Sequence, residues 1–85
     1  MTPETWFEQL SDALEEAGAV PGVRSGVTDE ERDALLELAR VAAHTSERWT
    51  APISTFLAGA VLHGLPAQER AAAIRRLVSD LEPAS

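Results

Sequence analysis

Residues 51–63 read Ala-Pro-Ile-Ser-Thr-Phe-Leu-Ala-Gly-Ala-Val-Leu-His and contain no Asp, Glu, Lys or Arg. Pro52 fits the first turn of a helix, where a missing backbone N–H costs little, and Gly64 fits the position just past its end. A helix with this composition is apolar on nearly every side, which is typical of a helix surrounded by others. It is too short to span a membrane, which takes about 20 apolar residues. The sequence therefore predicts the central helix of a small bundle. The core residues that it contributes are Phe56, Leu57 and Ala60.

A first helix is expected over residues 2–17, where Thr2 can cap the helix and Pro3 occupies its first position. Apolar side chains recur there at helical spacing and predict one buried stripe. The residues of this stripe are Trp6, Phe7, Leu10, Ala13, Leu14 and Ala17. Residues 18–27 hold three Gly and one Pro, which is typical of a connector.

A second helix is expected over residues 28–48. Thr28 and Glu31 have the spacing of a capping box, in which each side chain bonds the backbone N–H of the other residue. The short connection before Pro52 makes this helix an antiparallel neighbour of the third. A fourth helix follows over residues 66–81. Three arginines are expected to face out from it, toward a carboxylate or water: Arg70, Arg75 and Arg76.

Composition places limits on fold and function. The 85 residues fit one helical domain, 1–85, and predict an all-α, small four-helix bundle with an apolar central third helix. There is no cysteine, and the net charge of −7 disfavours nucleic-acid binding, which needs clustered cations. No secretory signal and no membrane-spanning stretch is visible, so a cytoplasmic protein is expected. The oligomeric state is left open.

One polar face carries the candidate binding residues Arg40, His44, Glu47 and Arg48. At about 100° per residue they share one side of the second helix, with Arg40, His44 and Arg48 one turn apart. Two guanidinium groups beside an imidazole can hold a phosphate or a carboxylate. The alternative is a solvated face with ordinary ion pairs, each stabilising by about 0.3–0.5 kcal/mol. Both interpretations stay open from the residues alone.

Metal binding and catalysis are not expected. The two histidines, His44 and His63, are predicted to lie about 10 Å or more apart along an antiparallel hairpin, which is too far for a shared ion. His63 fits a cation at a helix C-terminus. Ser54 and Thr55 are expected to be capping or packed hydroxyls rather than nucleophiles. We therefore expect no enzyme, no metal and no cofactor.

The run from Leu38 to His44, then Glu47-Arg48, then residues 51–59 resembles a short domain of unknown function found in actinobacteria. The shared pattern is Ala-x-x-x-Ala-His-x-x-x-Arg-x-x-Ala-Pro-x-x-x-Phe-Leu-x-Gly, and the resemblance covers about residues 30–64. That family occurs alone and as an appendage of nucleotidyltransferases similar to molybdenum-cofactor guanylyltransferase. The resemblance implies an accessory role, and it places His44 and Arg48 within the motif.

These observations favour a non-catalytic accessory or protein-interaction module, linked through the resemblance to molybdenum-cofactor guanylyl maturation. The partner implied is a nucleotidyltransferase of cofactor biosynthesis. The alternative is a small anionic-ligand or nucleotide-phosphate binding protein that uses Arg40, His44 and Arg48.

Overall fold

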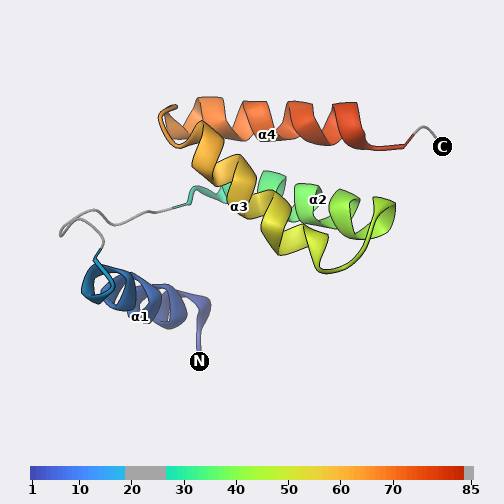
Figure 1. The fold of residues 1–85 in the computed structure, drawn as a ribbon. Helices are drawn as coiled ribbons and strands as arrows, with labels where there is room; N and C mark the ends of the chain where they lie inside the picture. Colours follow the sequence, from blue (N-terminus) through green and yellow to red (C-terminus); the bar gives the residue numbers. More distant parts are fainter. Residues whose placement is uncertain (19–26, 84–85) are drawn as a thin grey trace.

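The computed structural model describes residues 1–18 and 27–83, and these residues form four helices and no strand (Figure 1). The helices are α1 (Pro3–Glu16), α2 (Asp29–Thr45), α3 (Thr50–Leu62) and α4 (Ala67–Leu81). The expected all-α, four-helix class is confirmed. Most of the expected connector, residues 19–26, lies outside the described residues, as do residues 84–85.

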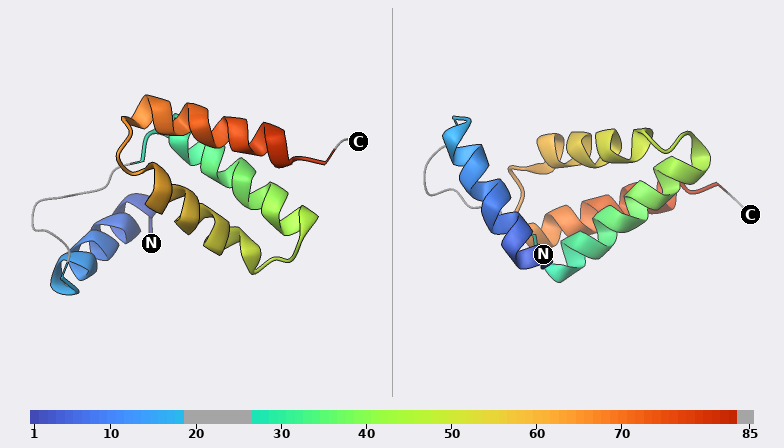
Figure 2. Two further views of the ribbon diagram at one scale, coloured as in Figure 1. Left: turned by 45° about the horizontal axis from the view of Figure 1, so that its top comes forward. Right: turned by 90° about the horizontal axis from the view of Figure 1, so that it is seen from below.

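Helix α2 is the element on which the packing depends. It lies along both α3 and α4, whereas α3 and α4 meet each other over only a short stretch (Figure 2). Ala34 and Leu38 of α2 form one buried cluster with Ala58 of α3 and Ile74 of α4. Alanines allow the helices to approach closely but bury little apolar area, so the cluster stabilises the fold less than large side chains would.

Helix α3 is far more exposed than its composition predicts. Ala58 is its one buried residue among those described, while Phe56 is 70% exposed and Leu57 55% exposed. Ala60 is exposed as well. The expectation that these three residues lie in the core is therefore wrong. The physical reason is that α3 packs mainly against one neighbour, α2, so a helix that is apolar all round can bury only one side.

Helix α1 forms where it is expected but does not join the core. Thr2 caps it, because its hydroxyl oxygen accepts a hydrogen bond from the Thr5 backbone N–H at 3.2 Å. Gly18, with φ +111°, follows its end in a conformation that favours glycine. Yet α1 contacts none of the other helices (Figure 1), and Trp6 and Phe7 are 51% and 60% exposed. The buried position expected for its apolar stripe is not observed.

Helix α2 ends at Thr45, three residues before the expected end at residue 48. The cause lies in the turn that follows. The Thr50 hydroxyl is placed to donate to the carbonyl oxygens of Glu47 at 2.6 Å and Ala42 at 3.2 Å. Because Ala42 lies in the last turn of α2, these contacts connect the start of α3 to the end of α2. The turn uses residues that helix periodicity alone assigns to α2.

At the opposite end, an ion pair joins α2 to α4. The Glu31 backbone N–H donates to the Thr28 hydroxyl oxygen at 3.1 Å, which is half of the expected capping box. The Glu31 carboxylate instead accepts two hydrogen bonds from Arg70, at 2.7 and 2.9 Å. Arg70 also donates to the Leu65 carbonyl oxygen at 2.6 Å. Arg70 therefore meets a carboxylate, one of its two expected partners, but it is partly buried rather than outward-facing and holds the beginnings of α2 and α4 together.

The Glu31→Gln variant should unfold more easily than the parent protein. Glu31 is only 5% exposed and its charged hydrogen bonds are lost in the variant, so we expect a loss of about 1.5–3 kcal/mol. Urea denaturation followed by circular dichroism measures this free energy. Glu30→Gln is the matched control, since Glu30 is exposed in the same helical turn and should change stability by less than about 0.5 kcal/mol. Equal effects of the two substitutions would contradict a structural role for the ion pair.

The stabilising effect of Glu31 should also disappear in acid. Hydrogen bonds from Arg70, opposed by burial, lower the pKa of the Glu31 carboxyl below its ordinary value of 4.5. A lowered folded-state pKa gives stability that is fully present above pH 4.5 and is lost as the pH falls through the folded value. The difference in unfolding free energy between parent and Glu31→Gln should therefore be constant from pH 7 to 5 and shrink below pH 4.5. A difference that persists at the lowest pH would argue against this ion pair as its source.

Candidate functional site

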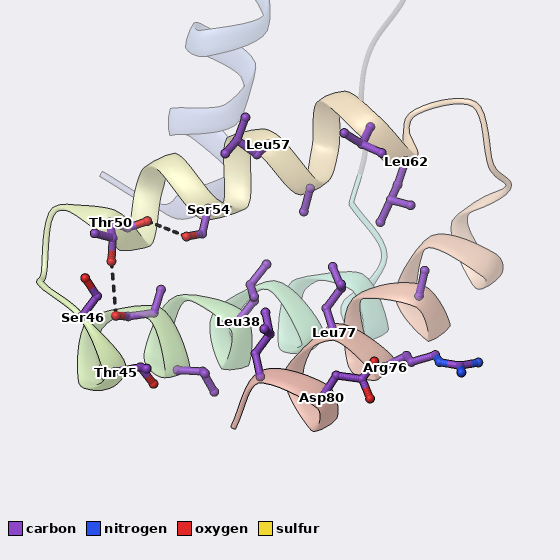
Figure 3. A pocket seen from close by; sticks show the side chains of 16 residues that line it. Leu38, Thr45, Ser46, Thr50, Ser54, Leu57, Leu62, Arg76, Leu77 and Asp80 are labelled. Atoms are coloured by element: carbon purple, nitrogen blue, oxygen red, sulfur yellow. Dashed lines mark hydrogen bonds between the residues drawn. The ribbon is translucent and has the colours of Figure 1, made fainter. Parts of the chain in front are cut away.

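An apolar groove runs between α3 on one side and the C-terminal halves of α2 and α4 on the other (Figure 3). It has a volume of about 830 Å³. Leu38 and Val41 are the buried α2 residues that line it. Its remaining large apolar side chains are at least one-third exposed, apart from the half-buried Leu62. These exposed residues are Leu57 and Val61 of α3 and Leu77 and Leu81 of α4.

The polar side chains of the groove are few, and its two α3 hydroxyls have backbone partners. Ser54 donates to the Thr50 carbonyl oxygen at 2.7 Å, and Thr50 bonds the turn after α2 (Figure 3). The charged residues that line the groove are Arg76 and Asp80, both from α4. A surface of this kind is suited to bury an apolar face of another molecule.

A second apolar surface lies on a different side of α3. Trp49, Ile53, Phe56 and Ala60 recur at the spacing i, i+4, i+7 and i+11, which places them along one helix face. We call this face the α3 stripe. Trp49 is 65% exposed, Ile53 51% and Phe56 70%. The Trp49 indole N–H donates to the Glu47 carboxylate, which orients the ring at the beginning of the stripe.

The four residues expected to share one polar face do not form a single site. Arg40 is engaged by carboxylates, with its guanidinium 2.6 Å from Glu82 and 3.1 Å from Glu37. The hydrogen bond to Glu82, followed by that to Glu37, raises the pKa of Arg40. Arg48 lies in the turn after α2, so it does not continue the row formed by Arg40 and His44 on the helix.

His44 and Arg48 are exposed, and among the described residues the structure shows no side-chain hydrogen bond and no ion pair for either. Glu47, the fourth candidate, bonds the Trp49 indole instead. The other histidine, His63, ends α3, and its Nδ1 donates to the Ala60 carbonyl oxygen at 2.9 Å, as a carbonyl can only accept. The two histidines therefore occupy separate local environments.

The described residues offer neither a metal site nor a helix that could span a membrane. Residues 1–18 and 27–83 contain no cluster of three His, Asp or Glu side chains placed to hold a metal ion. None of the four helices combines the length and the hydropathy needed to cross a bilayer.

Comparison with known families gives one result. Residues 2–85 match a domain described as "Domain of unknown function (DUF6457)", which covers nearly the whole chain. The chain belongs to the DUF6457 family. No curated protein and no solved structure matches it.

Two features of this DUF6457 chain were not expected from its sequence. The partners of Arg40 and Arg70 are distant in the chain, at Glu82 and Glu31, and no periodicity signals such pairs. The α3 stripe does have a signal, because its residues follow a seven-residue spacing. Phe56 and Ala60 were expected in the core because α3 carries no charge, but an apolar composition does not distinguish a face that packs within the chain from one that packs on a partner.

Proposed function

We propose that this DUF6457 chain is a non-catalytic protein-interaction module that presents the α3 stripe to a partner protein. The observation that carries the proposal is the exposure of Trp49, Ile53 and Phe56 along one face of a helix. Contiguous exposed apolar patches on small proteins mark interaction sites, whereas single exposed apolar residues need no explanation.

The composition of the α3 stripe also supports this function. Aromatic residues are enriched in the central parts of protein interfaces, and charged residues are depleted there. Two of the four stripe residues are aromatic, and α3 carries no charged side chain from Thr50 to Leu62. A helix that presents anchors at this spacing can lie in a groove of a partner or pack beside a partner helix.

The partner that we propose is a nucleotidyltransferase of molybdenum-cofactor biosynthesis, with the module acting as an accessory in guanylyl maturation. The support is the resemblance of the motif around residues 38–59 to a domain that also occurs appended to such transferases. Pro52, Phe56 and Gly59 of this motif lie on α3. Phe56 belongs both to the motif and to the stripe, so its surface is the part of the chain where contact is expected.

Phe56→Ala should weaken binding to the purified nucleotidyltransferase without unfolding the module. Truncation of a central aromatic anchor costs about 2 kcal/mol or more, which is about a 30-fold loss of affinity. Isothermal titration calorimetry gives the affinity, and a thermal melt checks the fold. Leu36→Ala is the matched control, because Leu36 is 62% exposed on α2 and lies outside both the stripe and the groove. An affinity unchanged by Phe56→Ala, or lowered equally by Leu36→Ala, would overturn the proposed contact.

A second candidate function is the binding of a small anion or a nucleotide phosphate. The observation that favours it is the exposure of His44 and Arg48 without an ion-pair partner among the described residues. Arg40 contributes less to this candidate than the sequence predicts, because Glu37 and Glu82 already surround its guanidinium.

If this second function holds, titration with phosphate or a guanine nucleotide should shift the NMR signals of residues 44–48 before others. His44→Ala and Arg48→Ala should abolish the shift and stay folded, since exposed substitutions usually change stability by under about 0.5 kcal/mol. Arg75→Ala is the control, as it removes an exposed arginine from α4. First shifts in the acidic helix α1, or unfolding of His44→Ala, would refute anion binding at this place.

A further inference from the structure

In addition to the α3 stripe, each chain carries two apolar surfaces that no other described residue covers. One is the groove between α3 and the pair α2 and α4. The other is the apolar face of α1, which we call the α1 stripe. Its members are Trp6, Phe7, Leu10 and Leu14, which are 51%, 60%, 37% and 47% exposed. Two such surfaces on one molecule raise the question of whether they fit each other.

The dimensions of the two surfaces agree. Helix α1 has 14 residues and is about 21 Å long at 1.5 Å per residue. The groove is lined by α3 residues from Thr50 to Leu62, 13 residues with a helical length of about 20 Å. Its exposed leucines and valine stand on both sides, so an inserted helix could place its aromatic rings between α3 and α4 (Figure 3).

The charges agree as well. Residues 3–16 hold five acids and no base, and four of these acids are exposed: Glu4, Glu8, Asp12 and Glu16. On the groove side, Arg76 lines the opening and Arg75 is its exposed neighbour on α4. Neither arginine has an ion pair among the described residues, while Asp80 is the acid that also lines the groove. Asp80 lies one helical turn from Arg76 on the same side of α4, so the acidic flank of α1 meets two cations and one acid there, a net charge of opposite sign to its own.

We propose that α1 of one copy of this chain occupies the groove of a second copy, so that two chains form a symmetric dimer by exchanging α1. In the structure α1 is already helical but lies apart from the other three helices, with its stripe open (Figures 1 and 2). Two chains can satisfy both surfaces at once, because a two-fold axis makes each contact occur twice and closes the assembly.

The area involved is sufficient for a stable dimer. Large aromatic side chains bury about 150–250 Å² each, and covering the stripe and the groove twice removes on the order of 1,500 Å² from water. Specific protein interfaces bury about 1,200–2,000 Å². This dimer leaves the α3 stripe free, because the stripe lies on another face of α3. The proposed dimer is therefore independent of the contact between the α3 stripe and a partner protein, and either proposal can fail alone.

Cysteine cross-linking tests the exchange directly, because the native chain contains no cysteine. Full-length Leu10→Cys protein is mixed with full-length Val61→Cys protein under mild oxidation. We expect a disulfide-linked pair that contains one chain of each kind, identified by mass spectrometry. Leu36→Cys replaces Val61→Cys in the control, since Leu36 is exposed but lies outside the groove, and that mixture should give little mixed product.

Interface variants test the same contact without cross-linking. Sedimentation velocity should show a dimer of the parent chain, and Trp6→Ala or Leu57→Asp should weaken it by about 30-fold or more, as expected for loss of an anchor. Leu36→Asp should leave the dimer intact. Mixing Trp6→Ala with Leu57→Asp should restore part of the dimer, because the mixed pair keeps one intact stripe and one intact groove.

Three results would overturn the proposal. A parent chain that stays monomeric at high concentration while a doubly substituted Leu10→Cys, Val61→Cys chain links within itself would show that α1 fills its own groove. Cross-linking of Leu10→Cys chains to each other in preference to Val61→Cys chains would show α1 pairing with α1. A monomeric parent chain with no cross-link, either within a chain or between chains, would show that α1 does not bind the groove.

Discussion

The two hydrogen bonds between Arg70 and Glu31 fix the position of α4 on α2, the helix on which the rest of the packing depends. They connect the first turn of α2 to the first turn of α4, in a place where the Glu31 carboxylate is almost entirely buried. A buried ion pair is not in itself strongly stabilising, but the loss of one partner leaves a charge without compensation. The pair therefore holds α2 and α4 in one relative position. Helix α3 is held separately, at the other end of α2, through the Thr50 hydroxyl.

The groove stays open because the helices are joined at their ends and only loosely packed between them. Polar contacts fasten the ends of the helices, while the packed middle is made largely of small residues such as Ala34 and Ala58. Helix α3 can then approach α2 closely but meets α4 only briefly. Leucines that a fourth helix would normally cover, such as Leu77 and Leu81, line the space between α3 and α4. The chain has the composition of a four-helix bundle and the packing of a three-helix unit.

This open packing leaves much apolar surface exposed. Exposed aromatic and aliphatic side chains lie in three places: the α1 stripe, the groove and the α3 stripe. The α1 stripe and the groove match each other in length and charge, whereas the α3 stripe has no counterpart in the chain. In the two proposals, the α1 stripe and the groove contact a second copy of the chain, and the α3 stripe contacts a different protein. The polar groups at His44 and Arg48 form a separate and smaller candidate.

The sequence by itself determined the local structure. Thr2, Thr28 and the prolines marked where helices begin, because capping and the missing proline N–H act within a few residues. The order of the four helices and the all-α class followed from periodicity, and the end of α2 was misplaced only where a long-range bond from Thr50 intervened. For the candidate site, the sequence identified His44 and Arg48 but not which cations already have partners. The tertiary structure alone decided that Arg40 meets Glu82 and that Arg70 meets Glu31. It also decided that Phe56 and Trp6 stay exposed, because periodicity shows which face of a helix is apolar, whereas burial depends on whether another surface covers that face.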